Sequence, residues 1–249
     1  MPTAAAPWRL QVFESLPSTS DLLRNLAAAG EPEGAAVLAR RQERGRGSHG
    51  RAFSSPVGNM FLSVLLRPGG PVREGGLWSL LAGLVVAEAV AALLPDPAML
   101  TLKWPNDVLL DRKKLAGILV DSAATDAGTL DWLVVGIGVN LAIAPAIPDR
   151  PTACLAEVID PPPSDAMAES VLARLAHWRG IQTSQGWPPV RDAWRARAQP
   201  LGAALTLTAG ARELHGSFAG LGDDGSLLLE TDGKVEAFTA GEVRLRVGA

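Results

Sequence analysis

Residues 45–51 read Gly-Arg-Gly-Ser-His-Gly-Arg, so three glycines and two arginines stand in seven positions with no acidic residue among them. Glycine lets the backbone adopt dihedral angles that bring its N–H groups close to a ligand. Each guanidinium group offers a planar fork of donors that matches a phosphate or a carboxylate. This loop therefore predicts an anion-binding site.

The glycine spacing in this loop also satisfies the G-x-G-x-x-G pattern of dinucleotide-binding folds and protein kinases. A Rossmann site requires a helix that begins at the loop, but here residues 53–56, Phe-Ser-Ser-Pro, and then a strand-like segment follow. The sequence also lacks the catalytic-loop and metal-binding motifs of protein kinases. The loop is therefore assigned to neither class.

A second cluster combines two lysines with a carboxylate. Lys103-Trp104-Pro105-Asn106-Asp107 is followed seven residues later by Lys114-Leu115-Ala116-Gly117. Two strands that each carry a lysine can point both ammonium groups into one pocket, where Asp107 can hold a magnesium ion on phosphates. The alternative is a hairpin whose lysines are solvated.

Composition restricts the classes of function. The chain has 249 residues, of which 47% are apolar, enough for a sizeable core. The net charge of −3 gives no global field that favours nucleic acid or an anionic membrane, so a nucleotide must be held by a local cluster. Cys154 is the single cysteine, which fits a reducing compartment, and we expect no signal peptide at the start of the sequence.

The elements that must position these motifs are a mixture of helices and adjacent strands. A helix is predicted over 19–29, with Ser18 and Asp21 spaced as a capping box and Gly30 at its end. The apolar stretch 77–94 approaches the length of a membrane span but contains Glu88, and it is predicted to be a buried helix. Amphipathic helices are predicted over 164–179 and 188–198. Strands are predicted over 35–40, 59–66, 100–103, 108–110, 114–121 and 132–140. This order favours an α+β sheet over regular βαβ winding.

The predicted secondary structure changes after Pro200 from helices to short strands. Short strand-like segments from 204 to 247 are separated by glycines and by Asp-Gly pairs. This pattern is typical of a small β-barrel of about 45 residues.

The motifs, taken in chain order, together resemble those of biotin protein ligases. They are Ser18-Thr19, Gln42, Gly45-Arg46-Gly47, Gly50-Arg51, Lys103 to Asp107, Lys114 to Gly117, and Gly136-Ile137-Gly138-Val139-Asn140, with Gly225 to Leu229 and Gly241 to Arg246 in the tail. The resemblance implies a mixed-sheet, class II synthetase-like catalytic domain of the biotin/lipoate ligase fold over 1–199. It also implies a small C-terminal SH3-like β-barrel over 200–249. No helix-turn-helix segment precedes Trp8, as in the short form of the family without a DNA-binding domain.

The resemblance also implies a two-step activity. Biotin would react with Mg-ATP to form biotinyl-5′-AMP and pyrophosphate, and a lysine of a biotin carboxyl carrier domain, from acetyl-CoA carboxylase or a related carboxylase, would then take the biotin. The expected enzyme is cytoplasmic, a monomer or weak homodimer, and acts without nucleic acid or membrane.

Residue roles follow from the same resemblance. Arg46 and Lys114 would be catalytic and face the substrate carboxylate and the acyl-phosphate oxygens. The residues implied for biotin are Ser18, Thr19, Ser20, Gln42, Arg46, Gly47, Ser48, Lys114 and Gly117. Those implied for ATP are Arg51, Phe53, Lys103, Asn106 and Asn140, with Asp107 as the magnesium ligand.

The sequence departs from the family pattern at three of these positions. Ser48 stands where the family usually has arginine, Phe53 where it has tryptophan, and Ser20 where asparagine is common. A lost charge-assisted hydrogen bond typically costs about 1.5–3 kcal/mol, so either His49 or another residue compensates for Ser48, or the adenylate is held less tightly. Two other functions stay open on the sequence: a lipoate or octanoate ligase or transferase of the same fold, and a non-catalytic biotin-binding paralogue.

Overall fold

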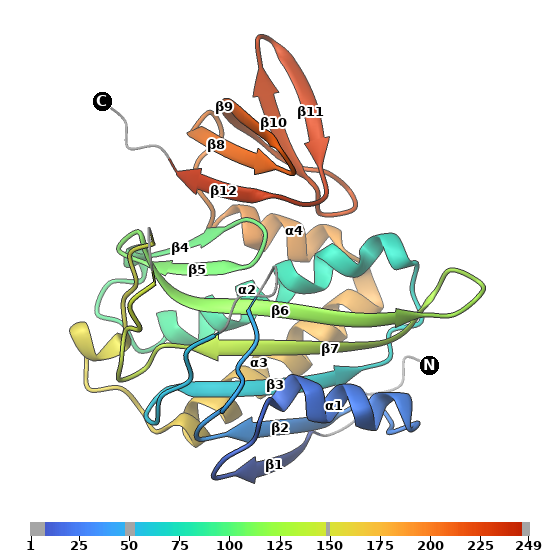
Figure 1. Ribbon diagram of the computed structural model, residues 1–249. Coiled ribbons are helices and arrows are strands. Elements are labelled where there is room, and N and C mark those ends of the chain that lie inside the picture. The colour runs from blue at the N-terminus through green and yellow to red at the C-terminus, as the bar shows by residue number, and fades with distance from the viewer. Residues whose placement is uncertain (1–7, 48–52, 148–149, 246–249) are drawn as a thin grey trace.

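The computed structural model describes residues 8–47, 53–147 and 150–245, which form two β-sheets and the helices that pack on the larger one (Figure 1). The first sheet has seven strands in the order β1-β2-β3-β7-β6-β5-β4. Its strands are β1 (Arg9–Phe13), β2 (Ala35–Ala39), β3 (Met60–Leu66), β4 (Leu100–Lys103), β5 (Asp107–Leu110), β6 (Lys113–Ala124) and β7 (Leu130–Val139). β1 runs parallel to β2 and the other neighbours are antiparallel, so the prediction of a mixed α+β sheet is confirmed.

Helices cover both faces of this sheet. They are α1 (Thr19–Ala28), α2 (Gly75–Ala91), α3 (Ser164–Gln185) and α4 (Pro188–Arg195), with the short 3-10 turns η2 (Val72–Glu74), η3 (Pro97–Met99) and η4 (Leu155–Glu157). α1 packs on one face, and α2 and α3 pack on the other (Figure 1). The predicted start of α1 is confirmed, because the Ser18 hydroxyl accepts a hydrogen bond from the Asp21 N–H at 3.3 Å. Gly30, with φ +90°, follows its end.

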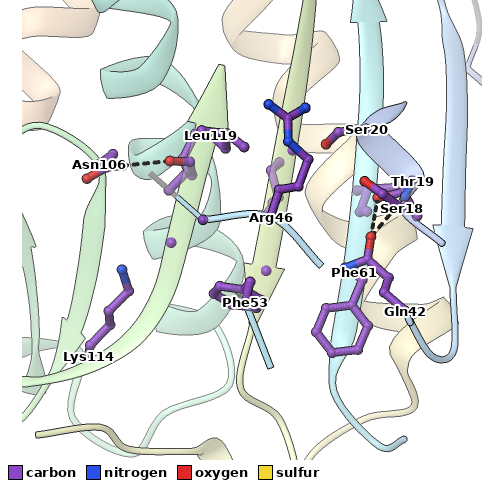
Figure 2. Close-up of a pocket in the computed structure, with 17 residues that line it drawn as sticks. Ser18, Thr19, Ser20, Gln42, Arg46, Phe53, Phe61, Asn106, Lys114 and Leu119 are labelled. Carbon is purple, nitrogen blue, oxygen red and sulfur yellow. Dashed lines mark hydrogen bonds between the residues drawn. The ribbon is translucent and has the colours of Figure 1, made fainter. Parts of the chain in front are cut away.

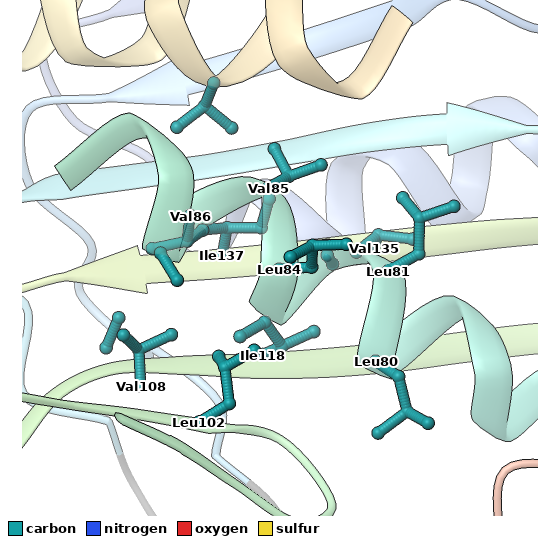
Figure 3. Packing of buried hydrophobic residues seen from close by; sticks show 14 of the residues in the cluster. Leu80, Leu81, Leu84, Val85, Val86, Leu102, Val108, Ile118, Val135 and Ile137 are labelled. Atoms are coloured by element: carbon teal, nitrogen blue, oxygen red, sulfur yellow. The ribbon is translucent and has the colours of Figure 1, made fainter. Parts of the chain in front are cut away.

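Helix α2 forms the centre of the main core. Its leucines and valines, among them Leu84 and Val85, pack against Ile118 of β6 and Ile137 of β7 (Figure 3). Val72–Ala91 is long and apolar enough to cross a membrane, with a mean hydropathy of 1.4, but 67% of its apolar 18-residue stretch is buried inside the protein. The prediction of a buried core helix in this stretch is confirmed.

The second sheet is antiparallel and lies beside α2, α4 and β4 (Figure 1). Its strands are β8 (Ala204–Ala209), β9 (Arg212–Leu221), β10 (Leu227–Thr231), β11 (Lys234–Phe238) and β12 (Glu242–Leu245), in the order β11-β10-β9-β8-β12. Polar contacts join this part of the chain to the first, among them the ion pair of Arg191 on α4 with Asp223. The buried indole N–H of Trp104 donates to the carbonyl oxygen of Gly225 at 3.0 Å, and Glu242 forms an ion pair with Arg150.

Several elements differ from the predicted bounds by one to three residues, such as α4, which ends at Arg195 and not at 198, and two differ by more. The sequence analysis missed β1, an edge strand whose residues are half-buried or exposed and so lack a continuous apolar pattern. Helix α3 runs six residues beyond the predicted end at 179 and stops before Gly186, which has φ +76°.

Candidate active site

The candidate site is a pocket on the face of the large sheet that carries α1 (Figure 2), and Gly117, Gly136 and Gly138 form part of its floor. Across the sheet, Phe61 of β3 pairs with Gly138 of β7, and Gly138 pairs with Gly117 of β6. Further along β3 and β7 on the same face, Leu65 and Val134 fill the space under α1. The change from these side chains to glycine leaves the pocket open where α1 begins.

Small polar side chains form one wall of this pocket. The hydroxyl of Thr19 contacts that of Ser63 at 2.7 Å, and Ser20 contacts the same Ser63 oxygen at 3.0 Å. The Gln42 side-chain oxygen accepts from the backbone N–H of Thr19 at 2.9 Å and from its hydroxyl at 3.1 Å, and the Gln42 amide donates to Ser55 at 3.0 Å. This wall therefore offers several hydroxyl groups and an amide, which can donate and accept. Ser18 also lines the pocket and caps α1.

A buried carboxylate gathers the cations on the other side of the floor. Asp107, which is 4% exposed, pairs with Lys103 at 2.7 Å, with Lys114 through its other oxygen, and with Arg150 at 4.0 Å. The turn between β4 and β5 places Lys103 opposite Asp107, and the Lys114 side chain lies beside Gly117. Three cations around one carboxylate give this part of the site a positive charge.

Burial and charge act in opposite directions on this cluster. Burial alone would raise the pKa of Asp107, but Lys114 and Lys103 outweigh it and hold this pKa below its usual value. Burial lowers the pKa of Lys114, with a further lowering from Arg150 and Lys103, although Asp107 opposes the shift. Asp107 is therefore an ionised counter-ion in the neutral pH range.

Arg46 is held by two carboxylates. Its Nη1 atom lies 3.0 Å from Asp21 and 3.0 Å from Asp121, and its Nη2 atom lies 3.4 Å from Asp121. Burial would lower the pKa of Arg46, but Asp121 and Asp21 outweigh it and raise this pKa. Figure 2 shows the guanidinium group on the side of Ser20, away from the ammonium group of Lys114. The two residues predicted to be catalytic thus line one pocket, but their charged groups do not meet.

The other predicted residues fall around this pocket in different ways. Gly47, Gly117, Asn106 and Phe53 line it, and the Asn106 amide donates to the backbone oxygen of Ile118 at 2.7 Å. Phe53 stands over the glycine floor, with its ring 6.2 Å from that of Phe61. Asn140 lines a smaller adjoining pocket together with Phe53 and Lys114. Its amide donates to the backbone oxygens of Ala153 at 3.0 Å and Lys114 at 3.4 Å.

The roles predicted for all these residues stay predictions, and three of them have a particular reason. Ser48 and Arg51 lie outside the described residues. Asp107 as a magnesium ligand stays a prediction, because each of its carboxylate oxygens already contacts an ammonium group. Over residues 8–47, 53–147 and 150–245, His, Cys, Asp and Glu side chains form no group of three or more placed to hold a metal ion.

Sequence reasoning missed Ser63, Asp121 and Arg150. Ser63 could have been found, because it is the one polar residue in the otherwise apolar strand β3. Asp121 follows Gly117 by four residues on a strand and so falls on the same face, which was a weak signal. Arg150 lies outside the named strands and helices, and no sequence pattern links it to Asp107.

Comparison with known proteins finds relatives for both parts of the chain. Residues 12–140 match the model of the biotin/lipoate A/B protein ligase family, and residues 201–246 match the biotin protein ligase C-terminal domain. The biotin–acetyl-CoA-carboxylase ligase of Paracoccus denitrificans is 36% identical, over 83% of this chain and 88% of that protein. The enzyme of the same name from Mycobacterium tuberculosis is 33% identical, over 96% of this chain and 90% of that protein.

A solved structure shares the fold along nearly the whole chain. The biotin protein ligase of Aquifex aeolicus in complex with biotin and ATP superposes with a TM-score of 0.78 and 27% identity, over 96% of this chain and 99% of that one. A family model that covers half of the sequence, relatives above 30% identity along most of their length, and this fold all agree. The chain belongs to the biotin/lipoate protein ligase family, among its biotin protein ligases.

Proposed function

We propose that this protein is a biotin protein ligase, which activates biotin with ATP to biotinyl-5′-AMP and transfers the biotin to a lysine of a biotin carboxyl carrier domain. The observation that carries the proposal is one pocket that joins a wall of hydroxyl and amide groups to a buried, positively charged lysine cluster. The membership of the chain among biotin protein ligases selects biotin as the ligand of that pocket.

The polar wall suits the ureido ring of biotin. This ring is neutral and carries both N–H donors and a carbonyl acceptor, so it needs partners of both kinds. Thr19, Ser20 and Gln42 can supply them, and Ser63 adds a fourth group. The Phe53 ring lies over Gly138 and bounds the space beside Gly117, so we assign Gly117 to the space that the fused rings and the aliphatic chain fill and Gly138 to the position of that ring.

The lysine cluster suits the charged part of the reaction. The first step brings the carboxylate of biotin to a phosphate of ATP, and two anions approach only where cations offset their repulsion. We propose that Lys114 faces these oxygens, that Lys103 and Arg51 hold phosphates, and that Asn106, Asn140 and Phe53 lie near the nucleotide. Mg²⁺ supplies charge neutralisation when bound with ATP. For Asp107 to ligate it, an ammonium group would have to leave this carboxylate, so we assign Asp107 first to the lysines.

We further propose two domains, a catalytic domain over 1–199 and an SH3-like barrel over 200–249. The second is supported by five short strands that are antiparallel to their neighbours, with an irregularity in register between β9 and β10. The names of the relatives support acetyl-CoA carboxylase as the source of the carrier domain. A cytoplasmic monomer or weak homodimer that needs neither nucleic acid nor membrane completes the proposal.

The test is incubation of the protein with biotin, Mg-ATP and a carrier domain of acetyl-CoA carboxylase, with the mass of the carrier as the readout. We expect a gain of one biotinyl group on one lysine. A gain with lipoate but not with biotin would favour the related lipoate ligases. Binding of biotin without release of pyrophosphate from ATP would instead show a binding protein without catalysis.

Substitution of Gly138 by alanine should weaken biotin binding at least tenfold. An added Cβ would lie 2.6 Å from the Phe53 ring, a distance that forces the ring or the strand to move into the pocket. Calorimetric titration with biotin gives the dissociation constant. Gly180→Ala is the matched control, because nothing lies within 4 Å of its added Cβ on α3. Unchanged affinity in Gly138→Ala would contradict the proposal that the Phe53 ring over Gly138 bounds the space for biotin.

A further inference from the structure

We propose that Asp121 is a specificity-determining residue, which occupies Arg46 until a ligand carboxylate replaces it and so lowers the affinity of the site for an anionic ligand relative to a neutral one. The inference rests on the proposed function, in that Arg46 is taken to receive the carboxylate of biotin. Asp121 lies on β6 and its role was not apparent from the sequence.

The contact between Arg46 and Asp121 engages both carboxylate oxygens. Nη1 lies 3.0 Å from Oδ2, and Nη2 lies 3.4 Å from Oδ1. The side chain of Asp121 is 21% exposed and that of Arg46 is 36% exposed, so both are partly shielded from water. This is the paired, planar arrangement by which arginine binds any carboxylate, including that of a ligand.

Asp121, rather than Asp21, is the group that the exchange leaves unpaired. Asp21 also accepts from Arg24 at 3.2 Å and therefore keeps a cation when Arg46 moves away. Within the part of the chain that the structure describes, Arg46 is the cation that Asp121 contacts. When Arg46 moves away, Asp121 therefore loses its ion pair, while Arg46 exchanges the Asp121 carboxylate for the carboxylate of the ligand.

The position of Asp121 along β6 holds Arg46 away from Lys114. Gly117, Leu119 and Asp121 alternate onto the pocket face, so Asp121 stands four residues further along the strand than the glycine beside Lys114. The Arg46 guanidinium group contacts Asp121, and Figure 2 shows it on the side of Ser20, away from the Lys114 ammonium group. Arg46 must leave Asp121 to join Lys114 at one ligand carboxylate. A ligand with a neutral end requires no such exchange.

The test is Asp121→Asn, an isosteric change that removes the charge. We expect biotin to bind about two- to fivefold more tightly, the range that a partly exposed ion pair contributes. Biotinol, in which a neutral alcohol replaces the carboxylate, should bind with unchanged affinity. Both dissociation constants come from calorimetric titration. Equal or weaker binding of biotin, or an equal change for both ligands, would overturn the proposal.

A second variant, Arg46→Gln, distinguishes the exchange of carboxylates on Arg46 from simple repulsion between Asp121 and the ligand. In Arg46→Gln, no guanidinium group is left to exchange, so a further Asp121→Asn change should not tighten biotin binding. The same gain in both backgrounds would overturn the proposal, because it would show through-space repulsion only. Asp131→Asn is the matched control: Asp131 of β7 pairs at 2.9 Å with Arg67, which directly follows β3, and loss of this pair should leave the biotin affinity unchanged. If the unaltered protein binds no biotin, the proposed function itself is contradicted.

Discussion

Replacing Lys114 by alanine is expected to lower the rate of biotinyl-5′-AMP formation by about 10²- to 10³-fold, the loss typical of a preorganised donor that faces developing charge. The residue combines the features that such a donor needs. It lines the pocket, its ammonium group is largely buried, and Asp107 fixes its position. Release of pyrophosphate from ATP and biotin, measured under single-turnover conditions, gives the rate of this step without a carrier domain.

Lys113→Ala is the matched control for this measurement. Lys113 is the preceding residue on β6, but its side chain is 48% exposed and pairs with Glu157 at 3.5 Å on the outside of the protein. The Lys113→Ala variant should release pyrophosphate at a rate within twofold of that of the unaltered enzyme. A Lys114→Ala enzyme as fast as Lys113→Ala would contradict the main catalytic assignment.

Replacing Asp107 by alanine is expected to lower the free energy of unfolding by about 3–5 kcal/mol, because the change leaves Lys103 and Lys114 buried without their counter-ion. Urea unfolding at neutral pH measures the loss, and pyrophosphate release by the folded fraction should fall with it. Asp192→Ala is the control, since Asp192 is 73% exposed in a pair within helix α4, and it should change stability by about 0.5 kcal/mol or less.

The same residue gives a dependence of stability on pH. The pKa of Asp107 is lower in the folded protein than its ordinary value of 3.8, so its contribution is fully present above that pH and is lost as the pH falls through the folded value. The stabilities of the unaltered protein and of Asp107→Ala should therefore converge at strongly acidic pH. If the two proteins instead differ by a constant free energy of unfolding down to strongly acidic pH, the ion pairs of Asp107 are not the source of that difference.

Local sequence patterns predicted most of the fold. The strand expected over 100–103 is β4 to the residue, and the cap of α1 at Ser18 was visible from its spacing to Asp21. Such features depend on neighbours within a few positions, where periodicity and capping chemistry act. Strand β1 could not be found in this way, because its main stabilising partner is the backbone of β2, about 26 residues away.

The candidate site was predicted in its parts but not in its connections. The two lysines were expected to share a pocket, and Asp107 indeed joins them, although β5 lies between their strands. The pairing of Arg46 with Asp121 spans 75 residues and joins two segments that are distant in the sequence. No local rule specifies such a contact, since it is fixed only when the sheet has assembled.

The hydrogen bond from Trp104 to Gly225 bears on how the protein is made in the cell. Its partners are 121 residues apart, so at a typical synthesis rate of 5–20 residues per second the ribosome adds the acceptor roughly 6–24 s after the donor. Trp104 stands beside Lys103, and Arg150, which contacts Asp107, pairs with Glu242, a residue that is synthesised 17 positions after Gly225. We expect a nascent chain to complete its reactive centre only as its last strands emerge, which would keep half-made molecules from consuming ATP.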